Sequence, residues 1–381
     1  MPQNSGFSYW EQASFLTHDV AVIGSGIVGL NAALHIIQTN PSLNIVVVDR
    51  GFLPSGASTK NAGFACFGSV SELLDELETT PENELLRVME LRWKGLQKLR
   101  KTLGDQALDY QENGGFEIFT TGDQELSEKC IGNIPYLNRL AGTVIGKPDI
   151  YAVRNEKIAG FGLGNISSMI ENRYEGQIDS GKMMRALLRK VQGEGVLVLN
   201  SCRVDRIRQD EKGAVLETGH GSIRARKVVV ATNAFATEFF PELDMVPGRG
   251  QVLITEPVPG LPVKGTFHYD KGYYYFRNIN DRILLGGGRN LDFKKEETDR
   301  FGITEPVQNR LEHLLHEVIL PGHKPKIEQR WSGIMAFGDT LTPIITEIRE
   351  NVFCAVRCNG MGIAMGSQVG ETVGDMVLKA L

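Results

Sequence analysis

The feature that most constrains the fold lies between residues 19 and 49. A short apolar run at 20–23 precedes the glycine pattern Gly24-x-Gly26-x-x-Gly29, and apolar residues then recur at helical spacing over 30–37. A second apolar run at 45–48 ends in Asp49, about 20 residues after the last glycine. Runs that are apolar on both faces are typical of central parallel strands. The order strand, glycine turn, helix, strand and acid predicts a parallel α/β domain.

Each residue of this pattern has a physical role in holding a dinucleotide. Gly24 permits the tight turn, Gly26 lets the backbone approach a pyrophosphate, and Gly29 lets the helix lie close to the sheet. The helix N-terminus offers free amides to the phosphates, and Asp49 can accept both hydroxyls of a ribose. The alternative is an incidental glycine turn, and the motif alone does not choose between NAD and FAD. The predicted cofactor contacts here are Gly24, Ser25, Gly26, Ile27, Val28, Gly29, Asp49 and Arg50.

A second glycine-flanked segment follows the acid, at 56–63. Its small and polar residues suit a second helix N-terminus packed against a flat or phosphate-bearing ligand. The alternative is a plain loop with a helix cap. The predicted ligand contacts are Ala57, Ser58, Thr59, Lys60, Asn61, Ala62 and Gly63.

Composition excludes several classes of protein. Glycine makes up 43 of the 381 residues, about 11% against a usual 7%, but shows no collagen period. The net charge of -5 argues against nucleic acid as a partner. No apolar run reaches the roughly 20 residues of a membrane span, and the N-terminus lacks the pattern of a signal peptide. Five widely spaced cysteines indicate reduced thiols, and we expect a cytoplasmic protein.

Further motifs follow in order along nearly the whole chain. They are Gly176-Gln177-Ile178-Asp179, Val228 to Ala234, Arg249-Gly250-Gln251, Gly286-Gly287-Gly288-Arg289, Trp331-Ser332-Gly333-Ile334 and Asn359-Gly360-Met361-Gly362. With these motifs and the segments 19–30 and 56–63, the sequence resembles the D-amino-acid-oxidase-like family of FAD-dependent oxidoreductases. This is the group of glycine oxidase, sarcosine oxidase and γ-glutamylputrescine oxidase.

The resemblance implies FAD, and the absence of a flavin-linking cysteine near Gly333 implies that it is bound non-covalently. The C-terminal motif independently suits a flavin, because a helix N-terminus there would stabilise negative charge on a reduced ring. The alternatives are ordinary sheet core and a glycine turn made for packing. The further cofactor contacts implied are Val204, Ala231, Thr232, Asn233, Asn359, Gly360, Met361, Gly362 and Ile363.

The resemblance also implies an α/β fold with two interleaved domains. A Rossmann-type FAD-binding domain would comprise 1–90, 155–243 and 336–381. An α+β substrate domain with a mixed or antiparallel sheet would comprise 91–154 and 244–335. Helix signals over 80–104 (Thr80 as N-cap, Pro81, then Gly104) and strand signals near 116–119, 248–256, 273–277 and 282–285 agree with this division.

The implied substrate-side residues are His268, Tyr274, Arg277, Trp331 and Met335. Strand alternation places Tyr273, Tyr275 and Arg277 on one face and Tyr274 on the other. Arg277 could bind a carboxylate in bidentate fashion or form an exposed ion pair, and Trp331 could be core packing. Met335 stands where glycine and D-amino-acid oxidases carry a carboxylate-binding arginine, which weakens the case for a simple α-amino acid.

We therefore expect an enzyme that oxidises the CH–NH bond of an amine or amino acid. Hydride would pass to flavin N5, the imine would hydrolyse, and oxygen or another acceptor would reoxidise the flavin. No metal site is expected, and His313 with His316 is interpreted as a surface helix. The alternatives are a flavin-dependent 2-hydroxy-acid dehydrogenase with His268 as base, and a non-catalytic dinucleotide-binding or tRNA-modifying module.

Overall fold

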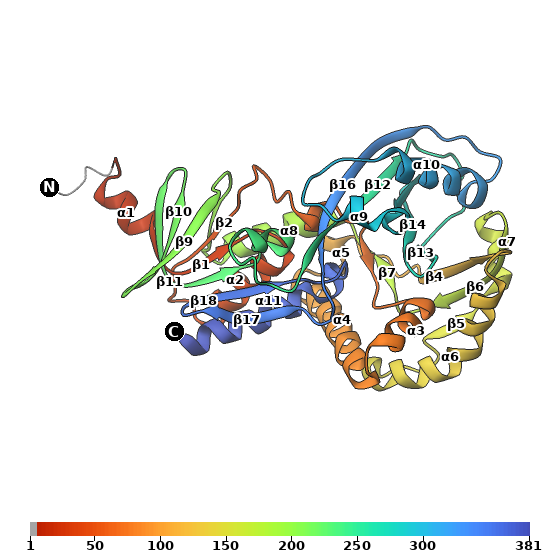
Figure 1. Cartoon of the computed structure of the whole chain (residues 1–381), viewed down its shortest axis with the longest axis horizontal. Coiled ribbons are helices and arrows are strands. Elements are labelled where there is room, and N and C mark those ends of the chain that lie inside the picture. Colours follow the sequence, from red (N-terminus) through yellow and green to blue (C-terminus); the bar gives the residue numbers. More distant parts are fainter. Residues whose placement is uncertain (1–5) are drawn as a thin grey trace.

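The computed structural model describes residues 6–381 (Figure 1). Residues 1–5, on which the expectation of no signal peptide partly rests, lie outside the described residues. Within 6–381, the strands form two eight-stranded sheets and one two-stranded sheet. The large sheets build two lobes side by side, and α1 (Tyr9–Phe15) lies at the same end of the molecule as the last turn of α11 (Gly362–Ala380).

The first sheet has the strand order β17-β18-β11-β1-β2-β8. Its strands from β18 to β8 pair in parallel, and β17 pairs antiparallel to β18 at one edge. The antiparallel hairpin β9–β10 extends from β11. The bounds are β1 Thr17–Ile23, β2 Ile45–Val48, β8 Leu197–Leu199, β9 Val204–Asp210, β10 Gly213–Thr218, β11 Gly221–Val230, β17 Ile344–Arg349 and β18 Val352–Val356.

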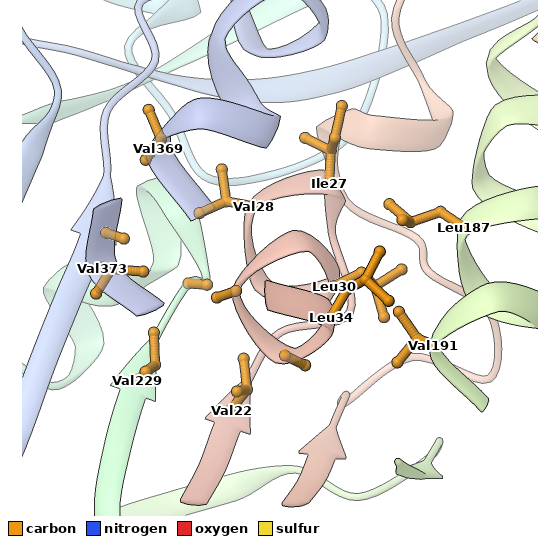
Figure 2. Close-up of a cluster of buried hydrophobic side chains, with 14 of the residues drawn as sticks. Val22, Ile27, Val28, Leu30, Leu34, Leu187, Val191, Val229, Val369 and Val373 are labelled. Carbon is orange, nitrogen blue, oxygen red and sulfur yellow. The ribbon is translucent and has the colours of Figure 1, made fainter. Parts of the chain in front are cut away.

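Three helices cover one face of this sheet: α2 (Ile27–Thr39), α8 (Ser180–Gly193) and α11. Figure 2 shows α2 between them, with its side chains packed on Val22 and Val229 of the sheet. Alternate strand residues such as Ala21 and Ile23 face the opposite side, where the β9–β10 hairpin packs. Both faces are buried, as the apolar runs predict. Gly370 lets α11 cross α2 closely, because a Cβ there would lie 2.7 Å from the Val28 carbonyl oxygen.

The second sheet has the order β16-β12-β15-β14-β13-β4-β6-β5, and only β13 and β4 pair in parallel. This mixed sheet agrees with the predicted fold class. The bounds are β4 Gly115–Thr120, β5 Tyr151–Val153, β6 Ile166–Asn172, β12 Val246–Thr255, β13 Thr266–Tyr269, β14 Tyr274–Ile279, β15 Arg282–Gly287 and β16 Ile327–Phe337.

Helices cover most of the second sheet. One face packs on α10 (Glu305–Leu314) and the π turn Leu315–Ile319. At the β4-β6-β5 end, the other face packs on helices α3, α4 and α6. The rest of that face packs in part on residues 60–64 of the first lobe and in part lines the space between the lobes. The remaining bounds are α3 Val70–Thr79, α4 Glu82–Leu103, α5 Asp105–Leu108, α6 Gln124–Ile145, α7 Ile158–Phe161, α9 Phe293–Glu296, the small sheet β3 Phe64–Ala65 with β7 Gly176–Gln177, and 3₁₀ turns at Ala57–Thr59, Asn155–Lys157, Asn233–Glu238 and Arg289–Leu291.

Several predicted boundaries differ from the structure. The division at 154/155 assigns β6 to the first domain, but β6 pairs with β4 and β5 in the second sheet. The division at 90/91 cuts through α4, which is one continuous helix. Pro81, rather than Thr80, is the N-cap of α4, and the predicted helix start within 56–63 is a single 3₁₀ turn. Pairing with strands that are distant in sequence decides which sheet β6 joins, and no local sequence pattern predicts that pairing.

Candidate functional site

A cavity of about 610 Å³ lies between the two sheets. On the side of the first sheet it is lined by residues at or just past the carboxyl ends of β1, β2, β11 and β18, among them Ile23, Val48, Ala231 and Val356. This edge is where doubly wound sheets bind their ligands.

The glycine turn after β1 brings its backbone to the cavity wall. Gly24 has φ +108°, and a Cβ there would lie 2.8 Å from the Ala231 carbonyl oxygen. Gly24 and Gly26 line the cavity, whereas Gly29 does not. A Cβ at Gly29 would overlap the Gly24 carbonyl oxygen, so this glycine sets the close approach of α2 to the turn. Gly24 therefore makes the turn and Gly29 the close approach of the helix, and the approach of Gly26 to a pyrophosphate stays a prediction.

Asp49 lies at the end of β2, on the cavity wall. Its Oδ2 accepts hydrogen bonds from the backbone N and the Oγ of Ser25, at 2.8 and 2.7 Å, and its Oδ1 accepts from Gly51 N. Ser25 is buried and does not line the cavity. Ser25 therefore orients the Asp49 carboxylate on the cavity wall.

The 56–63 loop is held by its own side chains. Asn61 Nδ2 donates to the carbonyls of Ala57 and Ser58, and Asn61 Oδ1 accepts from Gly63 N at 2.8 Å. Ser58 Oγ accepts from the Ile27 amide at 2.9 Å, which ties the loop to the start of α2. Thr59 Oγ1 donates to the Pro54 carbonyl and does not line the cavity.

The segment before α11 forms the far wall of the same cavity. Asn359 and Gly360 have φ of +46° and +82°, and α11 begins without a side-chain cap. The Thr232 hydroxyl, buried on the cavity wall, has no hydrogen-bond partner within residues 6–381. Of the predicted cofactor residues, those lining the cavity are Gly24, Gly26, Ile27, Val28, Asp49, Arg50, Ala57, Ser58, Lys60, Asn61, Ala62, Gly63, Val204, Ala231, Thr232, Asn233, Asn359, Gly360, Met361, Gly362 and Ile363.

These groups fit a FAD. The uncapped starts of α2 and α11 suit the pyrophosphate and an electron-rich ring edge, and Asp49 suits a ribose. On the second sheet, Gly250 of β12 and Gly333 of β16 stand opposite each other on the cavity wall. The side chains of Met335 and Lys60 lie against them, because a Cβ at Gly250 would lie 2.9 Å from Met335 Cε and one at Gly333 would lie 3.1 Å from Lys60 Cβ.

The second sheet supplies the remaining wall through alternate residues of several strands. Tyr275 and His268 are directly opposite on β14 and β13, and both line the cavity. Met335 lines it from β16. The Phe64 ring meets both His268 and Tyr275 edge-on, with centroids 5.2 and 5.6 Å apart. A half-enclosed aromatic pocket therefore continues from the cofactor region.

The structure places three predicted substrate-side residues outside the cavity lining. Tyr274 alternates to the opposite face and packs in the core against α10, so Tyr273 and Tyr275 line the cavity instead. Trp331 packs beside Val252 and donates its Nε1 hydrogen to the Lys60 carbonyl at 3.0 Å.

Arg277 points toward the first lobe as alternation predicts, but its guanidinium is engaged within the protein. Its Nη1 donates to the carbonyls of Gly63 and Ile178, at 2.9 and 2.7 Å. Burial lowers its pKa to about 10. Arg277 is therefore a buried tie between the lobes, neither an exposed ion pair nor a group facing the cavity.

The charged residues on the cavity wall differ in whether they are paired. Each lining acid has a partner within the protein; for example, Asp75 pairs with Lys271 at 2.5 Å and Glu76 with Arg92 at 3.0 Å. Within residues 6–381, Lys60 and Arg289 are the lining cations for which no carboxylate lies at ion-pair distance.

Arg289 follows the glycine cluster at the end of β15, and sequence reasoning missed it. Its guanidinium stacks 3.7 Å over Phe337 and faces Phe293 at 5.0 Å. Burial lowers the pKa of Arg289. The signal that could have found it is its place directly after three glycines at a strand end, where the backbone turns beside the cavity.

Titratable groups surround His268: Glu72 on the main cavity wall, and Glu117 and Glu175 buried behind the ring. Burial lowers the pKa of His268, and the nearby Glu72 carboxylate opposes this effect. Burial raises the pKa of Glu175 to about 8 and that of Glu117 to about 7. Sequence reasoning singled out none of these three acids.

Two absences hold for the part of the chain that the structure describes. No helix within 6–381 is long and apolar enough to cross a membrane. No group of three metal-ligating side chains occurs there, and His313 and His316 lie at the end of α10 and in the π turn after it.

The chain is similar to known proteins over most of its length. A family model described as FAD dependent oxidoreductase matches residues 19–376. Glycine oxidase of Geobacillus kaustophilus is 26% identical over 379 residues, covering 95% of this chain and 94% of the relative. Gamma-glutamylputrescine oxidoreductase of Escherichia coli is 24% identical over 387 residues, covering 95% and 84%.

Solved structures show the same fold. The crystal structure of glycine oxidase from Geobacillus kaustophilus matches with a TM-score of 0.75 at 20% identity, covering 96% of both chains. L-proline dehydrogenase from P. horikoshii matches with a TM-score of 0.76 at 18% identity, covering 96% and 94%. The family match contradicts the alternative of a non-catalytic module. This chain is an enzyme that uses FAD, and it belongs to the family of FAD-dependent oxidoreductases.

Proposed function

We propose that this enzyme oxidises the CH–NH bond of an amine or amino acid, with FAD bound non-covalently along the cavity. The observation that carries the proposal is a single cavity that joins the dinucleotide edge of the first sheet to an aromatic pocket on the second. The similarity to glycine oxidase and gamma-glutamylputrescine oxidoreductase supports a nitrogen-bearing substrate. When bound there, FAD supplies the acceptor for a hydride.

The chain's own residues would bind and orient the substrate. Tyr275, Phe64 and Met335 form an apolar wall that excludes water from the reacting C–H bond. Arg289 offers an unpaired guanidinium with two parallel donors, which suits a carboxylate. It could bind the substrate carboxylate in place of the arginine that glycine and D-amino-acid oxidases carry where this chain has Met335. This restores the case for an amino acid as the substrate.

The imine product would hydrolyse in water, and oxygen or another acceptor would complete the cycle. We further propose that the division into a FAD domain and a substrate domain follows the two lobes, with the first segment boundary after α4 and the second after β6. Acid precipitation of the protein tests the non-covalent linkage. It should release all the FAD into the supernatant, and yellow pellets would contradict it.

One observation favours a second function. His268 Nδ1 lies 3.6 Å from Glu72 Oε2, an arrangement that suits a general base for a hydroxyl group. A 2-hydroxy-acid dehydrogenase is therefore the competing proposal.

Anaerobic mixing of the holoenzyme with matched substrates separates the two. Each amino acid or amine is compared with the hydroxy compound of the same carbon skeleton, and flavin absorbance is followed. The proposal expects bleaching by nitrogen compounds and none by their hydroxy counterparts. Bleaching by hydroxy acids alone would replace it with the second function.

A further inference from the structure

A small second cavity lies directly behind His268, away from the main one. Its volume is about 10 Å³, close to what one water molecule needs. Its polar border comes from the N-cap of α3, from β4, β5, β6 and β13, and from the β6–β7 turn. The bordering polar residues are Ser69, Glu117, Tyr151, Asn172, Glu175 and His268.

Two buried polar atoms on this border have no hydrogen-bond partner within residues 6–381. They are His268 Nε2 and Asn172 Nδ2. A buried polar atom without a partner has lost its hydrogen bonds to water, so two such atoms on one small cavity point to a shared partner. His268 also lines the main cavity. Among residues 6–381 it is the one residue that borders both cavities, and its Nε2 has no hydrogen-bond partner there.

Glu175 faces the same nitrogen. Its Oε1 accepts from the amides of Phe67 and Gly68, at 2.8 and 3.2 Å, and its Oε2 lies 4.0 Å from His268 Nε2. This separation is too long for a direct hydrogen bond and suits one bridging water. Gly115 makes room for the carboxyl group, because a Cβ there would overlap Glu175 Oε2.

We propose that one internal water molecule occupies this cavity and bridges His268 Nε2, Glu175 Oε2 and Asn172 Nδ2. Through this water, Glu175 acts as a positioning residue that holds the His268 ring neutral, with its proton on Nδ1. Asn172 donates to the water oxygen, the protonated Glu175 carboxyl donates to the same oxygen, and the water donates to Nε2. The Nδ1 hydrogen then faces the Glu72 carboxylate at the cavity wall.

The charge balance of the region fits this arrangement. The titratable and charged groups facing the pair are Glu72, Glu117, Cys66, Tyr151 and Arg92. Arg92 is a cation beside Cys66 and Tyr151, and it is engaged with Glu76 at 3.0 Å. Since burial raises the pKa of Glu175 to about 8, its carboxyl keeps the donating proton at neutral pH. Above that pH the ionised carboxylate accepts one hydrogen of the water while the other still points to Nε2, so the change felt by the ring is a new negative charge beside Nε2.

The test replaces Glu175 with glutamine, which donates a hydrogen at all pH values. In the unaltered holoenzyme we expect an ionisation near pH 8 in two records: the limiting rate of anaerobic flavin reduction, and the ¹⁵N imidazole shifts of His268, assigned with His268→Gln. Glu175→Gln should lose this step in both records. Glu171→Gln is the matched control, since it removes a buried carboxylate of β6 that does not border the small cavity.

Three results overturn the proposal: an unchanged step in Glu175→Gln, a loss of the step in Glu171→Gln as well, or no ordered water at this position in a high-resolution crystal structure of the holoenzyme. Asn172→Ala gives a second route if Glu175→Gln does not fold, and it should shift the step by more than one pH unit. The kinetic record rests on the proposed function, whereas the imidazole and crystallographic records do not. If no amine or amino acid reduces the flavin, the proposed function fails, but the imidazole shifts and the crystal structure still decide this inference.

Discussion

At the scale of single residues, strand alternation predicted which face of a strand a side chain lies on, but not which groups that side chain contacts. Arg277 lies on the predicted face, yet it donates to two backbone carbonyls of the first lobe instead of facing the cavity. Nothing local in the sequence says that Gly63 and Ile178 will present those carbonyls, because they come from distant segments. Arg289, which no alternation rule singled out, is the unpaired guanidinium on the cavity wall.

Replacing Arg277 with methionine should lower the free energy of unfolding by about 2–3 kcal/mol, since two buried carbonyls lose charge-assisted hydrogen bonds. FAD should also bind more weakly, because the 56–63 loop loses its tie at Gly63. Urea unfolding and FAD titration measure both effects. Arg226→Met is the control, because its ion pair with Asp19 is exposed and should contribute less than about 1 kcal/mol. Equal losses in the two variants would contradict the role given to Arg277.

Burial of Glu175 should make stability fall with rising pH. The carboxyl ionises near its ordinary value of 4.5 in the unfolded chain, but keeps its proton to about pH 8 when folded. Between these values the unfolded state binds fewer protons, so unfolding free energy falls by about 1.4 kcal/mol per pH unit and then levels off. Glu175→Gln removes this contribution, and the slope left over belongs chiefly to Glu117. Urea unfolding of the holoenzyme at pH 5.5 and 8.5 checks it. A variant with the parent's slope would contradict the buried, protonated state, and exposed Glu211→Gln should keep that slope.

At the scale of elements, the strongest sequence signals were also the most accurate. Local residues fix each element of the first dinucleotide motif, and the sequence therefore predicted all of them. Apolar runs fix the two strands, helical spacing fixes the helix, and glycine at position 24 permits the positive φ of the turn. Thr59 and Ser25 show the limit of such signals. Both belong to the predicted segments, but both hold the backbone or another side chain and do not face the cavity.

Gly24→Ala should weaken FAD binding at least tenfold and lower stability by about 1–3 kcal/mol. Its φ of +108° disfavours any side chain, and the new Cβ would lie 2.8 Å from the Ala231 carbonyl oxygen. FAD content after purification and fluorescence titration measure the effect. Gly132→Ala is the control, since it lies exposed in α6 with nothing within 4 Å, and it should be neutral or slightly stabilising. FAD binding of parental strength in Gly24→Ala would show that the turn is not the cofactor's backbone contact.

Gly286→Ala should harm substrate use without loss of FAD. A Cβ there would lie 2.5 Å from the Tyr275 ring, which is partly buried and must move toward the cavity. Overpacking of this size costs about 1–3 kcal/mol, so kcat/KM should fall by roughly ten- to a hundredfold. Steady-state kinetics, normalised to the FAD content of each preparation, measure this fall in kcat/KM. Unchanged kcat/KM would mean that the Tyr275 ring does not border the substrate.

At the scale of the whole molecule, the two-lobe plan followed from the resemblance rather than from local pattern. The chain crosses between the lobes several times, and strands of one sheet come from segments far apart in sequence (Figure 1). Local patterns located most strands, but they could not say which sheet β6 joins, because its partners β4 and β5 decide that. For the same reason the acids around His268 escaped prediction: Glu72, Glu117 and Glu175 come from three separate segments and meet only in the folded protein.

The central claim is that one cavity holds FAD beside a nitrogen-bearing substrate. A single anaerobic turnover tests it most directly, with holoenzyme in excess over one amino acid or amine that bleaches the flavin, and with both products counted. The account predicts one carbonyl product and one ammonia or amine released for each flavin reduced, and no reduction by the hydroxy compound of the same skeleton. Flavin reduced only by the hydroxy compound, or by no compound other than dithionite, would contradict the account.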